Sequence, residues 1–183
     1  MATKNNKRTK ITKMLLQESL IELMHHKDIS HITIKEICET AELNRSTFYL
    51  HYSDQYQLLE EIETAIYDET NHYLQNVAFS ADTTEFVQNF LDYIKKNKDI
   101  FSILLCKQEN ISFKERFIAS ALASAQAYIN LGCPKHQEPY IFSFIISGCA
   151  RIICDWITQD FPMTSRELSE MIVNLCDAIR KNY

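Results

Sequence analysis

The side chains with the clearest capacity for chemistry lie close together, between residues 44 and 51. Arg45, Ser46 and Thr47 follow one another, and Tyr49 and His51 come directly after them. Such side chains donate and accept hydrogen bonds in the geometry that base edges and phosphate oxygens require. The stretch therefore indicates contact with a nucleic acid.

Two short helices joined by a tight turn are predicted to position these side chains. Thr33 and Glu36 have the spacing of a capping box, so a first helix should begin after Thr33 and end near Thr40. Asn44 is a good N-cap, so a second helix should begin at Arg45. Helix, short turn and helix is the geometry that places the second helix in the major groove of DNA. An ordinary helical hairpin would show the same pattern, so geometry alone leaves both interpretations open.

The motifs in this stretch resemble the DNA-binding domain of TetR-family transcriptional regulators. The matching positions are Thr33-Ile34-Lys35-Glu36-Ile37, then Ala41-x-Leu43-Asn44-Arg45-Ser46-Thr47-Phe48-Tyr49-x-His51-Tyr52, then Leu58-Leu59. The resemblance covers roughly the first third of the chain and implies a dimer that binds a palindromic double-stranded DNA operator, as a repressor. The side chains expected at the DNA are Thr33, Lys35, Asn44, Arg45, Ser46, Thr47, Tyr49 and His51.

Two positions depart from the pattern of that family. Glu42 stands where the family often has a turn glycine, which is acceptable if this glutamate adopts a turn conformation. Gln55 stands near the place where a lysine often opens the fourth helix and holds a phosphate. The second departure leaves that phosphate contact unsupported in this chain.

The composition predicts an all-α protein. The chain has 183 residues, of which 46% are hydrophobic, and only 2 glycines and 3 prolines. So few turn-forming residues favour a nearly all-helical fold of about nine helices. We expect an N-terminal three-helix helix-turn-helix domain over residues 1–53 and a helical bundle for effector binding and dimerisation over residues 54–183.

Charge is distributed unevenly between these two parts. Residues 1–54 hold eight basic and seven acidic residues, a sum of +1, and the remainder holds eleven and seventeen, a sum of −6. An N-terminal arm over residues 1–13, which overlaps the beginning of a helix expected from Thr9, contains five basic residues and no acidic one: Lys4, Lys7, Arg8, Lys10 and Lys13. Such an arm can hold DNA phosphates, although a solvated tail would have the same composition.

The region expected to form a helix from Glu138 to Gln159 is apolar nearly all round, which indicates burial on all sides. A bundle of this size can hardly enclose such a helix alone. A ninth helix is predicted to begin at the capping box Thr164-x-x-Glu167, and together the two helices suggest a four-helix homodimer interface. The residues expected there are Phe144, Ile145, Ile152, Ile153, Trp156, Met171, Ile172 and Leu175.

The C-terminal region resembles the TetR-family branch that includes the dihydroxyacetone-kinase regulator DhaS. The resemblance rests on Gly148-x-x-x-Ile152-x-x-x-Trp156-Ile157, followed by Pro162, Ser165, Glu167 and Leu168. The family implies a small-molecule effector in this domain, and the DhaS branch implies a protein coregulator as the alternative. Aromatic side chains could line a ligand cavity or simply fill the core, so the ligand-binding residues stay unassigned: Phe101, Phe117, Tyr128 and Trp156.

Other function classes find little support. No nucleophile–base pair is recognisable, and the neighbouring carboxylates Glu60 and Glu61 are expected on a solvated helix face, so an enzyme or a lipid carrier is disfavoured. We expect no metal and no cofactor, because the six cysteines are scattered and are interpreted as reduced core thiols. The longest apolar stretch, residues 140–153, is interrupted by polar residues and is expected to be too short to span a bilayer. A cytoplasmic location is expected, since the N-terminus is charged.

Overall fold

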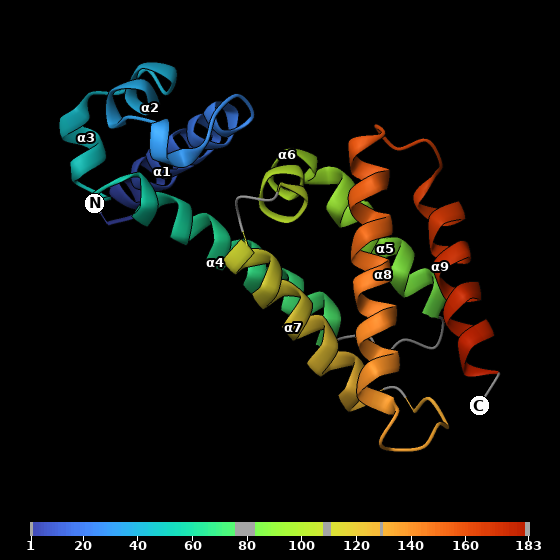
Figure 1. The fold of residues 1–183 in the computed structure, drawn as a ribbon. Coiled ribbons are helices and arrows are strands. Elements are labelled where there is room, and N and C mark those ends of the chain that lie inside the picture. The colour runs from blue at the N-terminus through green and yellow to red at the C-terminus, as the bar shows by residue number, and fades with distance from the viewer. Residues whose placement is uncertain (1, 76–82, 108–110, 129, 182–183) are drawn as a thin grey trace. The chain divides into compact units, whose positions relative to one another are not determined.

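The computed structural model describes residues 2–75, 83–107, 111–128 and 130–181. Within these ranges the chain forms nine α-helices, one 3-10 helix and one π-helical turn, with no β-strand, so the predicted all-α fold is confirmed (Figure 1). The residues divide into two compact units, Met1–Ile66 and Tyr67–Tyr183.

The first unit contains α1 (Ala2–Met24), η1 (Ile29–His31), α2 (Ile34–Thr40), α3 (Arg45–Tyr49) and the first turns of α4 (Gln55–Gln75). The sequence placed the division at residues 53/54, before α4, whereas the compact units divide within α4. The difference arises because the first turns of α4 bury apolar side chains that belong to the first unit, among them Leu58 and Ile62.

The core of the first unit brings together side chains from all four of its α-helices. These side chains have no exposed surface: Leu16, Leu20, Ile37, Phe48 and Leu58. Burial of one such side chain contributes about 1.5–3 kcal/mol to folding. Because Phe48 belongs to α3, the core holds that short helix in a fixed orientation.

Glu61 on α4 forms hydrogen bonds with α1 and with the end of the helix-turn-helix. It accepts hydrogen bonds from Lys13 Nζ at 2.6 Å, Gln17 Nε2 at 3.0 Å and Tyr52 Oη at 3.0 Å. The expectation that Glu60 and Glu61 share a solvated face is therefore wrong for Glu61, which faces α1. Glu60 is exposed.

The second unit contains the rest of α4 together with α5 (Thr83–Lys96), α6 (Lys98–Phe101), η3 (Ser102–Cys106), α7 (Ile111–Tyr128), α8 (Glu138–Thr158) and α9 (Ser165–Arg180). Helix α5 packs along α9, and α7 packs along α8. The π-helical turn η3 directs three consecutive apolar side chains, from Ile103 to Leu105, into the core.

The turn between α8 and α9 is closed by local contacts. Asp160 and Phe161 both have left-handed backbones, with φ of 57° and 61°. Trp156 Nε1 donates to the Met163 carbonyl oxygen at 2.8 Å, and its ring meets that of Phe161 edge-on, with the ring centroids 4.6 Å apart. The predicted capping box that begins α9 is confirmed in both of its hydrogen bonds, between Thr164 and Glu167.

Helix α8 is less buried than the sequence indicated. Only a third of its most apolar window is buried. The helix has 21 residues and a mean hydropathy of 1.5 over that window. By length and composition it is the one helix in the described ranges that could cross a membrane. That finding differs from the expectation for residues 140–153, although a core helix of a soluble bundle passes the same test. On one side of α8, Tyr140 and Phe144 are 78% and 72% exposed.

Candidate nucleic-acid interface and interior cavity

Helix α2 is fixed at its beginning by a reciprocal capping box. Thr33 Oγ1 accepts from the Glu36 N–H at 3.3 Å, and Glu36 Oε2 accepts from the Thr33 N–H at 2.9 Å. Lys27 Nζ donates to the other carboxylate oxygen of Glu36. The Lys27 hydrogen bond, followed by those of Thr33, lowers the pKa of Glu36 to about 2. The carboxylate therefore stays ionised at the helix N-terminus, where negative charge is favourable.

The turn between α2 and α3 uses a glutamate where a glycine would be unstrained. Glu42 has a φ of 54°, in the left-handed region. The Leu43 N–H donates to the Cys38 carbonyl oxygen at 2.8 Å, which closes the end of α2. Glu42 thus adopts the turn conformation that its position requires.

Helix α3 presents a polar first turn because its single buried residue fixes its rotation. Phe48 has no exposed surface, and its ring centroid lies 5.7 Å from that of Tyr52. Arg45 and Ser46 are then exposed, and Thr47 is half-buried. Asn44 occupies the N-cap with an extended backbone, but its side chain makes no capping hydrogen bond.

The first unit brings the remaining sequence-predicted residues near this turn with differing exposure. Tyr49 is 59% exposed, and His51 is half-buried with its ring against Tyr52. Lys35 is exposed on α2, and its Nζ lies 3.6 Å from a Glu39 carboxylate oxygen. Thr33 is also exposed, although its hydroxyl belongs to the cap of α2.

Two exposed side chains beside α3 were missed by the sequence reasoning. Leu50 is 79% exposed at the C-terminal end of α3, and Tyr56 is 52% exposed in the first turn of α4. The sequence could have predicted the exposure of Leu50. Each helical residue is rotated by about 100° from the previous one, so an inward Phe48 turns the next two positions outward. A leucine there can contact a thymine methyl group, and a tyrosine hydroxyl can donate to a phosphate.

The basic arm is helical, contrary to the expectation that α1 begins at Thr9. Helix α1 begins at Ala2, and on it Lys7, Arg8 and Lys10 are exposed. Lys13 is engaged inside the unit, because its Nζ contacts Glu61 at 2.6 Å and lies 5.3 Å from the centroid of the Tyr52 ring. The Lys4 side chain lies outside the described residues.

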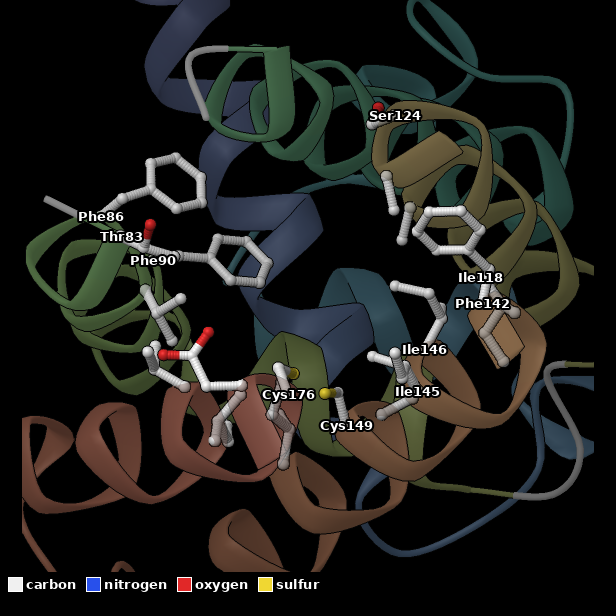
Figure 2. Close-up of a pocket in the computed structure, with 18 of the residues that line it drawn as sticks. Thr83, Phe86, Phe90, Ile118, Ser124, Phe142, Ile145, Ile146, Cys149 and Cys176 are labelled. Atoms are coloured by element: carbon white, nitrogen blue, oxygen red, sulfur yellow. The ribbon is translucent and has the colours of Figure 1, made fainter. Parts of the chain in front are cut away.

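The second unit contains a cavity of about 650 Å³ bounded by α5, α7, α8 and α9 (Figure 2). This volume lies in the range of small-molecule sites, about 300–1,000 Å³. Most of its wall is aliphatic or aromatic, including Phe86, Phe90, Phe117 and Ile146. The polar exceptions include Thr83, Ser124, two cysteines, and the ion pair of Asp177 and Arg180.

The four aromatic residues that the sequence left unassigned differ in whether they line the cavity. Phe117 lines the cavity, whereas Phe101 and Trp156 are buried in the core and are not part of the lining. The side chain of Tyr128 lies outside the described residues. Within the described ranges, no group of three or more histidine, cysteine or acidic side chains could hold a metal ion.

The residues expected at a dimer interface fall on two different surfaces. Ile145, Ile153 and Ile172 line the cavity, and Trp156 is buried in the unit's own core at 3% exposure. Ile145 is half-buried and the other three are buried within the single chain, and their place at a dimer interface stays a prediction.

An exposed apolar face remains on the outer side of α8 and α9. Three residues predicted at the dimer interface belong to it: Phe144 at 72%, Leu175 at 51% and Met171 at 36% exposure. Tyr140, which was not predicted there, is also exposed, and Ile152 is half-buried.

Two family models match this chain. The one described as "Bacterial regulatory proteins, tetR family" matches residues 18–62, which include α2 and α3. The one described as "Transcriptional regulator C-terminal region" matches residues 81–178, more than half of the chain.

Among curated relatives, the chain is 24% identical over 168 residues to the uncharacterized HTH-type transcriptional regulator YxbF of Bacillus subtilis (strain 168). It is also 24% identical over 112 residues to DhaS, the HTH-type dhaKLM operon transcriptional activator of Lactococcus lactis subsp. lactis (strain IL1403). The matches cover 87% and 61% of this chain, but only 43% and 51% of the relatives, so the chain spans about half the length of the curated relatives it matches.

Solved structures share the fold over nearly the whole chain. A TetR transcriptional regulator from Streptococcus agalactiae 2603V has a TM-score of 0.67 at 22% identity, with 96% of this chain and 99% of that chain covered. The dihydroxyacetone kinase operon activator DhaS has a TM-score of 0.58 at 16% identity, with 94% and 97% covered. The fatty acid degradation regulator FadR from Bacillus halodurans has a TM-score of 0.66 at 10% identity, with 90% and 94% covered.

Proposed function

The chain belongs to the TetR family of bacterial transcriptional regulators, and we propose that it binds a palindromic operator as a homodimer whose DNA affinity responds to a small apolar ligand. DNA reading is assigned to the N-terminal unit, and ligand binding and dimerisation are assigned to the C-terminal unit. The family consists of transcriptional regulators, so no enzymatic step is assigned.

The observation that carries the DNA-binding proposal is the orientation of α3. A fully buried Phe48 turns Arg45 and Ser46 outward at the beginning of the helix. In helix-turn-helix proteins the N-terminal residues of the second helix contact base edges. Arg45 is suited to bidentate contact with a guanine, and Ser46 can donate to bases or phosphates.

The surrounding side chains suit phosphate contacts on either side of α3. Lys35 on α2 and Tyr49 at the end of α3 are exposed, and Thr47 and His51 are partly exposed. Basic side chains on α1 add a further contact to the backbone. We add Leu50 and Tyr56 to the residues expected at the DNA, because both are exposed and follow α3 closely in the sequence.

A homodimer is supported by the exposed apolar face on α8 and α9. Phe144 and Leu175 are large apolar side chains that expose more than half of their surface in the single chain. Pairing this face with its copy across a two-fold axis would bury both sets and form a four-helix interface. Two reading helices would then meet half-sites about one helical turn of DNA apart, roughly 34 Å.

The cavity supports a small ligand as the effector. It is of ligand size and mostly apolar, and the Asp177–Arg180 ion pair in its lining could orient a polar group. A ligand changes DNA affinity only if it binds one conformation of the dimer more tightly than another. Filling the cavity by Ala121→Phe should lower binding of the fluorescent probe 1-anilinonaphthalene-8-sulfonate, and undiminished binding would place the probe elsewhere.

The alternative function is regulation through a protein coregulator. It is favoured by the similarity to DhaS, which is named an operon activator. The two proposals differ in what Ala121→Phe does. Under ligand control the Ala121→Phe regulator loses its response to the small-molecule effector, whereas under coregulator control the response survives. A promoter–reporter strain carrying either protein measures this response and also distinguishes the proposed repression from activation.

The DNA-binding proposal is tested by selecting bound sequences from random duplexes and titrating salt. We expect a palindromic site, and a loss of about 1–3 kcal/mol in binding for each Arg45 removed by Arg45→Ala. The matched control is Arg166→Ala, because Arg166 is an exposed arginine at the beginning of α9 in the other unit. If no palindrome emerges, or if both substitutions have equal effects, α3 is not the reading helix.

A further inference from the structure

Two cysteines that are far apart in the sequence meet on the wall of the cavity. Cys149 belongs to α8 and Cys176 to α9, and both line the cavity. Figure 2 shows the two sulfur atoms facing each other at the bottom of the cavity, and the interaction between the two thiols shifts the pKa of both. Both thiols are free and half-buried. The sequence did not anticipate this pair, because the six cysteines show no C-x-x-C spacing.

We propose that Cys149 and Cys176 form an oxidisable dithiol, and that an organic hydroperoxide entering the cavity converts them to a disulfide that links α8 to α9. An apolar cavity concentrates an oxidant with an apolar body, and the thiols are its nucleophilic groups. This inference goes beyond ligand-controlled DNA binding, and its readout is a covalent bond that does not depend on the operator.

The electrostatic surroundings favour Cys176 as the attacking thiol. The interaction with the Cys149 thiol lowers the pKa of Cys176, although burial and the Asp177 carboxylate act in the opposite direction. The same contact and burial raise the pKa of Cys149. Thiolates are the nucleophilic form of cysteine, so a lowered pKa gives Cys176 a larger reactive fraction at neutral pH.

The chemistry balances with the hydroperoxide as the oxidant. The Cys176 thiolate attacks the terminal peroxide oxygen, so that an S–O bond forms, the O–O bond breaks and the alkoxide leaves as an alcohol after taking a proton. Cys149 then attacks the sulfenic sulfur, the S–O bond breaks, and the hydroxide leaves as water with the proton from Cys149. Two thiols lose two electrons in total, and the hydroperoxide is reduced to alcohol and water.

A second thiol pair in the same unit provides an internal comparison. Cys106 in η3 and Cys154 in α8 also interact through their thiols, and the interaction raises the pKa of Cys106 and lowers the pKa of Cys154. Neither of them is part of the cavity lining in the described part of the chain. If the cavity selects the oxidant, the two pairs should differ in their response to an apolar hydroperoxide, even though their thiol–thiol contacts are alike.

The test exposes the reduced full-length chain to cumene hydroperoxide or to hydrogen peroxide, and then blocks free thiols and maps disulfide-linked peptides by mass spectrometry. With cumene hydroperoxide we expect the Cys149–Cys176 link to form several-fold faster than the Cys106–Cys154 link. Cys149→Ser and Cys176→Ser should each abolish the first link. The control Cys133→Ser should not, because Cys133 lies outside the cavity lining.

Ala121→Phe tests the role of the cavity itself. It should slow the Cys149–Cys176 reaction with cumene hydroperoxide more than the reaction with hydrogen peroxide. Three results would overturn the proposal: oxidation of single thiols to sulfinic acid with no linked peptide, equal rates for the two pairs, or an unchanged rate in a folded Ala121→Phe protein. The comparison of the two pairs needs no substitution, so it holds even if a variant fails to fold.

Discussion

Replacing Glu42 by glycine should make the helix-turn-helix more stable, although it removes a side chain. Glu42 has a φ of 54° at the turn between α2 and α3, and its side chain is exposed. A residue with a Cβ atom pays roughly 1–2 kcal/mol to occupy the left-handed region, whereas glycine does not. The change Glu42→Gly therefore removes strain from the folded state.

The gain is reduced by the freedom that glycine adds to the unfolded chain. That freedom costs roughly 0.5–1 kcal/mol relative to alanine. The difference leaves a net stabilisation of about 0.5–1 kcal/mol. For a chain of this length such a change corresponds to a rise in Tm of about 1–4 °C.

Urea and thermal unfolding of the full chain measure this difference. Hydrogen exchange at the Leu43 amide, which donates to Cys38 at 2.8 Å, reports on the turn directly. The matched control is Glu60→Gly, because Glu60 is also an exposed glutamate in the first unit but lies inside α4. There glycine should destabilise the chain by about 0.5–1 kcal/mol or more.

The two substitutions must therefore act in opposite directions. If Glu42→Gly lowers the Tm as Glu60→Gly does, the left-handed backbone is not a source of strain in this turn. An intermediate result is expected for Glu42→Asn, because asparagine tolerates the left-handed region better than most residues.

Three further predictions concern the core, the cap and the dimer. Phe48→Ala should cost about 3–5 kcal/mol in urea unfolding and abolish DNA binding, because it empties a fully buried site under α3. Glu36, whose pKa the Lys27 hydrogen bond lowers to about 2, stabilises the fold above its unfolded pKa near 4.5 and loses this effect as pH falls. The urea midpoints of the native chain and of Glu36→Gln should therefore approach each other as pH falls below about 5.5, and they should meet only below about pH 2, under the folded-state pKa of Glu36. Phe144→Arg or Leu175→Glu should give monomers in sedimentation, and an unchanged dimer would move the interface elsewhere.

Local signals in the sequence were sufficient for the helix boundaries that depend on caps. The boxes at Thr33 and Thr164 were predicted and are present in full. Each depends on residues only three positions apart, so no tertiary information is needed. The α1 boundary failed for a related reason: the polar residues before Thr9 carry no stop signal that would end a helix, and α1 continues back to Ala2.

Tertiary relationships were harder to predict because periodicity does not say which neighbour covers a face. Helix α8 is apolar nearly all round, so its sequence could not separate the cavity side from the exposed side. Ile145 and Phe144 were both predicted at the dimer interface, and the structure places Ile145 at the cavity and leaves Phe144 exposed. The pairing of Cys149 with Cys176 depends on how α8 and α9 are placed, which no local spacing encodes.

The two-sided character of α8 also constrains how such a chain could change over evolutionary time. Ile145 and Ile146 line the cavity, and Phe144 on the adjacent position faces outward. Packed helices accommodate a changed side-chain volume by shifting the backbone, because cores have few voids to absorb it. A substitution that adapts the cavity to a new molecule therefore displaces the outward residues as well. If the cavity binds the effector and the outer face forms the dimer, as proposed, ligand preference and self-association would change together in this chain.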